Sequence, residues 1–169
     1  NHALDSIRSD LPFLRGQPNG KALVNRRLQA MTEIMPGVRT VFLLDTGGTV
    51  TAANRDSLIG QNFREREYFQ IARQSGNPNL LHVSPPFRTS LGDFAMTLAK
   101  VILDDRGTFV GIVLATLDPE YFNVLLESVR YAPDMWTSLA HADGKLFLFV
   151  PKQPGTEGAD LAKPGSFYT

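Results

Sequence analysis

The chain has 169 residues, with 17 basic and 17 acidic side chains, no cysteine and a hydrophobic content of 43%. A net charge of zero leaves no excess of Lys and Arg to neutralise phosphates, so we expect no nucleic-acid partner. The absence of Cys excludes disulfide frameworks, thiolate metal sites, iron–sulfur clusters and cysteine nucleophiles.

The length fits one domain, or one and a fraction. The longest apolar runs, such as 41–44 and 146–150, are four to six residues long. They are far shorter than the ~20 residues that a membrane-spanning helix needs, so we expect the chain to be soluble. The sequence starts with Asn1 rather than Met and has no apolar leader, which indicates an excised or processed piece.

Residues 1–35 have helical periodicity with an interruption. Apolar side chains recur at helical spacing at Leu4, Ile7 and Leu11, and again at Val24, Leu28, Met31 and Met35. Pro12 and the Gly and Pro residues of 16–20 are expected to break the pattern between the two stripes. Pro36 and Gly37 are expected to end the second helix.

The pattern then changes to the period of strands. Strands are predicted over 38–45, 49–53, 80–85, 94–103 and 108–117, with one helix over 64–74. The loops between the last three strands are too short for helical crossovers, which disfavours a parallel nucleotide-binding sheet. The order of elements predicts a mixed α+β domain with a five-stranded antiparallel sheet.

A helix and a second hairpin follow the sheet. Asp118 is expected to cap a helix that starts at Pro119 and continues to Val129. Residues 135–142 and 146–150 predict a hairpin whose letters, LAHADGKLF, echo the FLLDTGGTV of the first hairpin. The tail after Pro151 has little apolar periodicity, so we expect the chain to stop before this unit is complete.

Five runs of sequence, taken together and in order, resemble a known family. They are VRTVFLLDTGGTVTAAN, GQNFREREYF, HVSPPF, DDRGTFVGIVLATLD followed by PEYF, and LAHADGKLF. The set resembles the extracytoplasmic double Cache (PAS-like) sensor domains of bacterial membrane receptors over about residues 20–150. Those receptors are histidine kinases of two-component systems, diguanylate cyclases and chemoreceptors.

The resemblance implies three parts. Residues 1–37 would be a long N-terminal helical segment, 38–130 a membrane-distal PAS-like unit that binds the ligand, and 131–169 the incomplete beginning of a membrane-proximal PAS-like unit. The chain would be a periplasmic domain of an inner-membrane protein, with its output module outside this chain. The first helix would pack on its own sheet or also form a homodimer seam, although Pro12 and Pro18 argue against a continuous coiled coil.

Motifs for catalysis and for metal binding are absent from the sequence. The three histidines, His2, His82 and His141, form no pair with metal-ligand spacing. The sequence has no G-x-S-x-G elbow and no phosphate-binding loop. We therefore expect no enzymatic activity, no metal and no cofactor in this chain.

The charged run REREYF, residues 64–69, is the first candidate for ligand binding. Arg66 and Tyr68 resemble the R-x-Y-F ligand motif of the family. There a guanidinium can bind a carboxylate through two parallel hydrogen bonds, and the phenol adds a third donor. The alternative is a solvated helix start in which Arg66 pairs with a nearby Glu. Phe69 is expected in the core under both interpretations.

The two long strands supply further candidates. If Thr116 lies opposite Ala95, then Thr97, Thr116 and Asp118 share one face of the hairpin and Lys100 lies on the other. A one-residue slip would exchange the faces, which leaves the choice between Thr97 and Lys100 open. The resemblance implies that Asp118 contacts the amine of an amino-acid ligand, and the alternative is that Asp118 only caps the helix.

The run HVSPPFRTSLGD contributes Ser84 and Arg88, on or beside a loop that contains Pro85 and Pro86. Such a loop could cover a pocket, with Arg88 as a second cation for a dicarboxylate. The alternative is a surface loop with an exposed Arg.

These observations lead to a functional prediction. We expect a sensor domain that binds a small anionic metabolite, a carboxylate or an amino acid, and transmits a conformational change to a cytoplasmic output module. The alternative is a PAS-like dimerisation or partner-docking domain with no small-molecule ligand, in which an internal salt bridge holds Arg66. An intracellular redox or cofactor-binding PAS domain is disfavoured, because the chain lacks a Cys and a suitably placed His.

Overall fold

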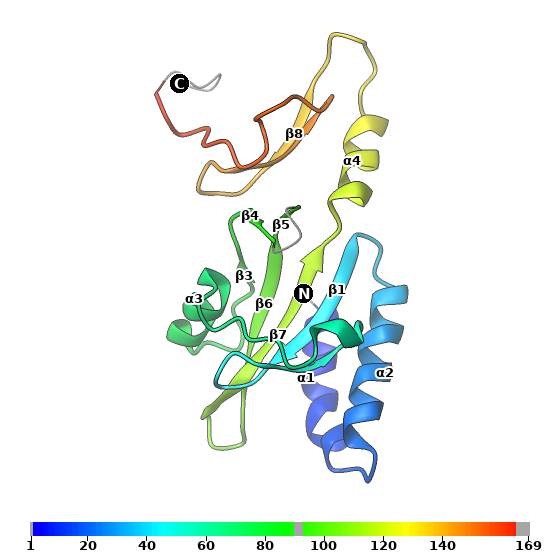
Figure 1. Ribbon diagram of the computed structural model, residues 1–169, viewed down its shortest axis with the longest axis vertical. Helices are drawn as coiled ribbons and strands as arrows, with labels where there is room; N and C mark the ends of the chain where they lie inside the picture. Colours follow the sequence, from blue (N-terminus) through cyan, green and yellow to red (C-terminus); the bar gives the residue numbers. More distant parts are fainter. Residues whose placement is uncertain (1, 90–92, 165–169) are drawn as a thin grey trace. The chain divides into compact units, whose positions relative to one another are not determined.

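The computed structural model describes residues 2–89 and 93–164 (Figure 1). It divides into two compact units. The first unit comprises Asn1–Val83 and Thr97–Thr116, and the second comprises Ser84–Met96 and Leu117–Thr169. Within the described ranges, no helix combines the length and the apolar character needed to cross a membrane.

The first unit begins with two antiparallel helices, α1 (His2–Arg15) and α2 (Gly20–Glu33). Both predicted apolar stripes are buried, at Leu4, Ile7 and Leu11 in α1 and at Val24, Leu28 and Met31 in α2. The interruption falls at residues 16–19 and not at Pro12, which lies inside α1. A proline removes one backbone donor, and the burial of Leu4, Ile7 and Leu11 before it, with Leu14 partly buried after it, outweighs that loss.

A five-stranded antiparallel sheet forms the centre of the first unit. Its strands are β1 (Val38–Leu44), β2 (Val50–Ala53), β3 (His82–Val83), β6 (Thr97–Leu103) and β7 (Phe109–Leu117), in the spatial order β2-β1-β7-β6-β3 (Figure 1). The predicted α+β class and the five-stranded sheet are confirmed.

Three predicted strands are shorter than expected, one of them the strand predicted over 135–142, which is β8 (Thr137–Ala140). The strand expected over 80–85 is paired only at His82–Val83. The strand expected over 94–103 is divided at Met96 into β5 (Phe94–Ala95) and β6. The reason is a change of partner, because β5 pairs with β4 (Phe87–Arg88) whereas β6 pairs with β7.

Helices cover both faces of the sheet. The helices α1 and α2 pack on one face, with Val41, Leu43, Ile102, Val113 and Ala115 of the strands beneath them. The opposite face carries α3 (Glu67–Ser75), which contacts β6 and β3. There Phe69 is fully buried and its ring meets that of Phe109 edge-on, so the predicted core role of Phe69 is confirmed. The short 3-10 helix η1 (Asp56–Leu58) lies in the connection from β2 to α3.

The hairpin turns share one device, an aspartate that accepts hydrogen bonds from the turn that it begins. Asp45 Oδ1 accepts from the amides of Gly47 and Thr49, each at 2.9 Å. Asp104 Oδ1 accepts from Arg106 and Thr108 in the same way. In the second unit, Asp143 Oδ1 accepts from Lys145 at 3.1 Å. This device explains why the two hairpins look alike in sequence.

The second unit contains β4, β5, α4 (Pro119–Ser128) and a hairpin of β8 (Thr137–Ala140) and β9 (Leu146–Val150). The helix α4 contacts both strands of the hairpin, and Leu146, Phe147 and Val150 are buried. Arg130 holds the connection between α4 and β8, because its Nε donates to the carbonyl of Met135 at 2.8 Å.

Candidate functional site

Arg66 stands at the start of α3, where it is the N-cap residue. Its backbone is extended (φ −74°, ψ 135°), and its carbonyl accepts hydrogen bonds from Phe69 at 3.0 Å and Gln70 at 3.2 Å. The helix therefore begins at Glu67, three residues later than the sequence predicts. This start places Arg66 beside the first turn, with its side chain half-buried.

Tyr68 lies in that first turn and is only 6% exposed. Burial raises the pKa of its phenol, and the positive charge of Arg66 acts in the opposite direction. Arg66 precedes Tyr68 by two residues, at the same end of α3. The phenol keeps its proton at neutral pH and can donate it to an acceptor. Arg66 and Tyr68 thus both stand at the start of α3.

Thr97 and Thr116 lie directly opposite each other on β6 and β7. Thr97 is 1% exposed and Thr116 is half-buried. The register differs by two residues from the one assumed above, in which Thr116 faced Ala95. The cause is the break at Met96, after which Ala95 pairs with Phe87. A shift of two residues keeps Thr97 and Thr116 on the face predicted for them.

The face of Lys100 is also determined by this register. Leu98 and Ile102 pack with the core formed by α1 and α2. Lys100 lies between them on the same face of β6 and contacts Asp5 of α1. Thr97 has the opposite parity and lies on the face that α3 covers. Arg66, Tyr68, Thr97 and Thr116 therefore belong to the same side of the sheet in the first unit, and Lys100 to the other.

The remaining three candidates belong to the second unit. Ser84 is buried, at 5% exposure. Arg88 is exposed on β4, and its guanidinium carbon lies 4.8 Å from the centre of the Phe94 ring on the paired strand. Asp118 caps α4, because its Oδ1 accepts from the amide of Glu120 at 3.1 Å. The predicted cap is confirmed, and the ligand roles of these three residues stay predictions.

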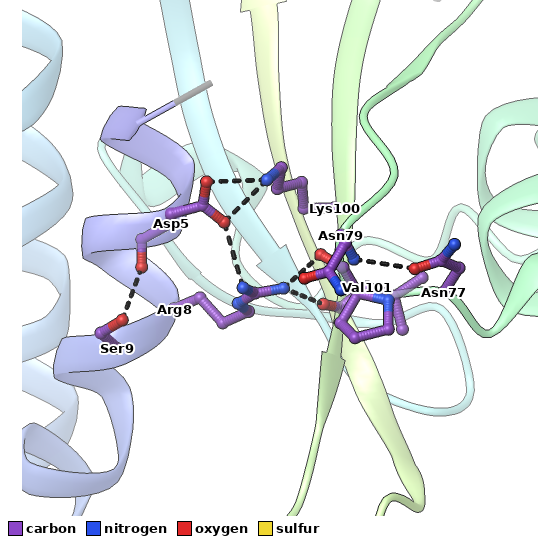
Figure 2. A network of polar contacts seen from close by, with 8 residues as sticks. Asp5, Arg8, Ser9, Asn77, Asn79, Lys100 and Val101 are labelled. Atoms are coloured by element: carbon purple, nitrogen blue, oxygen red, sulfur yellow. Dashed lines mark hydrogen bonds and ion pairs between the residues drawn. The ribbon is translucent and has the colours of Figure 1, made fainter.

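One polar cluster was not predicted from the sequence. Lys100, 3% exposed, binds both carboxylate oxygens of Asp5 at 2.7 Å (Figure 2). The sequence did contain an indication of this pair, since a lysine inside the apolar strand TLAKVIL needs an acidic partner. Asp5, between Leu4 and Ile7 on the apolar stripe of α1, is placed to supply one.

A metal site has no support in the residues that the structure describes, where no group of three or more His, Cys, Asp or Glu side chains could hold an ion. No protein-family model matches the chain, and no curated protein matches it.

Solved structures do resemble the chain. The extracellular domain of a protein assigned as a histidine kinase, rpHK1S-Z16, matches 89% of this chain and 64% of its own length, with 24% identity and a TM-score of 0.74. The ligand-binding domain of the Pseudomonas aeruginosa amino-acid chemoreceptor PctC, solved with GABA, matches 95% of this chain and 70% of its own, with 24% identity and a TM-score of 0.67. The sensor domain of the Vibrio cholerae histidine kinase DctB matches 92% of this chain and 57% of its own length, with 19% identity and a TM-score of 0.64.

The chain thus spans less than two thirds of the rpHK1S-Z16 and DctB domains that it matches. At these identities the likeness concerns the fold. These neighbours are sensor and ligand-binding domains rather than catalytic ones. The chain has the fold of the extracellular Cache-like sensor domains of histidine kinases and chemoreceptors.

Proposed function

We propose that this chain is the extracytoplasmic ligand-sensing domain of a bacterial transmembrane receptor. Its ligand is a small anionic metabolite, a carboxylate or an amino acid, which binds on the α3 side of the five-stranded sheet. One observation carries the proposal: Arg66 and the buried Tyr68 stand together at the start of α3, which covers the face of the sheet that holds the Thr97–Thr116 pair. The shared fold of the sensor domains supports it.

The chemistry of these side chains suits a carboxylate. A guanidinium offers a planar fork of donors that matches the two oxygens of a carboxylate. The phenol of Tyr68 stays protonated and adds a neutral donor. The hydroxyls of Thr97 and Thr116 can donate or accept, so they can bind either a carboxylate oxygen or a polar group elsewhere on the ligand. The GABA bound to PctC is itself a carboxylate with an amine.

We also propose the division predicted from the sequence. Residues 1–37 form the N-terminal helical segment, 38–130 the ligand-binding unit, and 131–169 the beginning of a membrane-proximal unit. The output module, a kinase, a cyclase or a chemoreceptor signalling domain, lies outside this chain and is reached through the membrane. The DctB domain, from a histidine kinase, and the rpHK1S-Z16 domain, from a protein assigned as one, support this placement.

The test is a thermal-shift screen against GABA, L-amino acids, succinate and citrate, because a ligand that binds only the folded chain raises the midpoint of unfolding. The expected result is a shift with one chemical class. Arg66→Ala removes two charge-assisted hydrogen bonds, each worth about 1.5 kcal/mol or more, and should weaken binding at least ~100-fold.

The chain offers a matched control for this variant. Arg64 lies two residues earlier in the same charged run and is exposed, so Arg64→Ala should bind the same ligand as the wild type does. Equal affinities of Arg66→Ala and wild type would contradict the carboxylate clamp. The absence of any shift over the whole panel would instead favour a docking domain without a small-molecule ligand.

A further inference from the structure

The helix α1 is attached to the sheet by charged groups as well as by its apolar stripe. The carboxylate of Asp5 binds Lys100 Nζ through both oxygens at 2.7 Å, and Arg8 Nη2 lies 3.1 Å from Asp5 Oδ1 (Figure 2). We call Asp5, Arg8 and Lys100 the α1 bridge.

The α1 bridge has little freedom to rearrange. Lys100 is 3% exposed and shares its face of β6 with Leu98 and Ile102, so the loss of Asp5 would leave its ammonium poorly solvated. The side chains of Asp5 and Arg8 are 32% and 24% exposed. A movement of β6 relative to α1 must therefore carry Asp5 with it or break this partly buried ion pair.

Arg8 connects the α1 bridge to the loop that follows α3. Its Nη1 donates to the carbonyl of Pro78 and, over a longer distance of 3.5 Å, to that of Val101 (Figure 2). Pro78 belongs to the loop that follows α3, which a hydrogen bond from the Asn79 amide to Asn77 Oδ1 shapes. Since β3 pairs only with Leu98 and Ala99, the Val101 carbonyl lies beyond the end of β3.

The two elements held in this way are the two that carry the candidate site. Lys100 follows Thr97 by three residues on β6, on the opposite face. Arg66 and Tyr68 lie at the start of α3, and the loop of Pro78 leaves its end. One helix thus contacts, from the far side of the sheet, the strand β6 and the loop that follows α3, and β6 and α3 are the elements on which we place the ligand.

We propose that the α1 bridge couples the candidate ligand site to α1, so that occupation of the Arg66–Thr97 face changes how α1 packs on the sheet. The proposal rests on the proposed function for the location of the ligand. A ligand that shifts β6 or α3 would move Lys100 or Pro78, and α1 would follow as a rigid helix. A ligand can bias such an equilibrium only through different contacts in the two states, and the bridge supplies those contacts at α1.

The coupling can be measured without a ligand, by hydrogen–deuterium exchange of the wild-type chain and of Asp5→Asn. The matched control is Asp10→Asn, because Asp10 lies on the same helix but pairs with Arg27 of α2 at 2.8 Å. Both variants should speed exchange in α1. Only Asp5→Asn should also speed it, by about fivefold to tenfold, at 66–70 and 97–101. An Asp5→Asn effect confined to α1 would overturn the proposal.

Arg8→Met provides a second variant, which leaves the buried Lys100–Asp5 pair in place and should speed exchange at 76–81 and in α3. If Asp5→Asn does not fold, Arg8→Met decides alone: unchanged exchange at 76–81 and in α3 would overturn the proposal.

A second experiment measures the same exchange in the presence of GABA or succinate. A probe that binds should change the exchange rate of α1 in the wild type and in Asp10→Asn. In Asp5→Asn the same probe should still bind, but the exchange rate of α1 should not change. An equal α1 response in Asp5→Asn would overturn the coupling and leave the binding function intact. If neither these probes nor the rest of the panel binds, the proposed function fails, and the exchange data still show whether α1 and the sheet are coupled.

Discussion

At the scale of single residues, Asp118 can have two roles that a pair of substitutions separates. Its carboxylate caps α4, and Asn caps a helix about as well as Asp does. Asp118→Ala should therefore cost about 1 kcal/mol and lower the unfolding midpoint by ~2–4 °C, whereas Asp118→Asn should keep the midpoint of the wild type. Calorimetry of the two variants measures both effects.

Asp118→Asn also tests the predicted contact with a ligand amine. Asp118→Asn removes the negative charge, so an amine-bearing ligand such as GABA should bind about tenfold more weakly, and succinate should bind as before. Unchanged GABA binding by Asp118→Asn would show that Asp118 is only a cap.

Thr97 and Lys100 illustrate which residue-level assignments a sequence allows. The alternation of β6 predicts that the two side chains lie on opposite faces, and they do. Alternation alone does not say which face meets which helix, because one residue of slip exchanges them. Asp5 settles the matter in the structure, and its partnership with Lys100 joins positions 95 apart along the chain.

At the scale of elements, Gly111 on β7 is the point where the sheet tolerates no side chain. Its φ is +147°, and a Cβ there would lie 2.1 Å from the carbonyl oxygen of Leu44 on β1. Gly111→Ala should therefore force the central strands apart and cost about 3 kcal/mol or more. Urea unfolding of the variant measures the loss.

Gly107 is the control for that substitution. It also has a positive φ, +77°, but a Cβ would meet nothing within 4 Å. Gly107→Ala should show only the cost of the backbone conformation, about 1–2 kcal/mol. Equal losses in the two variants would mean that the close approach of β1 and β7 does not matter for stability.

Elements with strong local signals were predicted well. The stripes of α1 and α2, the second hairpin and the cap of α4 each depend on residues close together in sequence. The break at Met96 was missed because β4 and β5 pair over two residues each, too few to show a period. The start of α3 was placed early because the charged run 64–66 fits a helix by propensity alone.

At the scale of the whole molecule, the fold follows from the order of such local elements, whereas the candidate site does not. Arg66 and Tyr68 were found together because a short motif holds them. Their place on the same side as Thr97 and Thr116 depends on which face of the sheet α3 covers, and the packing of apolar residues from distant segments decides that.

The stability of the molecule in acid depends on ion pairs between residues far apart in sequence, such as Asp5 and Lys100. The hydrogen bonds from Lys100 hold the pKa of Asp5 below its ordinary value. A carboxyl whose pKa is lower in the folded than in the unfolded chain contributes stability above its unfolded pKa and loses it as the pH falls through the folded one. Because the Asp5 side chain is 32% exposed, the contribution is about 1 kcal/mol.

We therefore expect the free energy of unfolding, measured with urea, to fall less steeply in Asp5→Asn than in the wild type between about pH 5 and pH 2. At neutral pH the wild type should be the more stable chain, and the difference should shrink as Asp5 takes up its proton. Asp10→Asn controls for the loss of a charge on α1 away from the buried lysine. A difference between wild type and Asp5→Asn that stays constant with pH would show that the Lys100 pair adds nothing beyond packing.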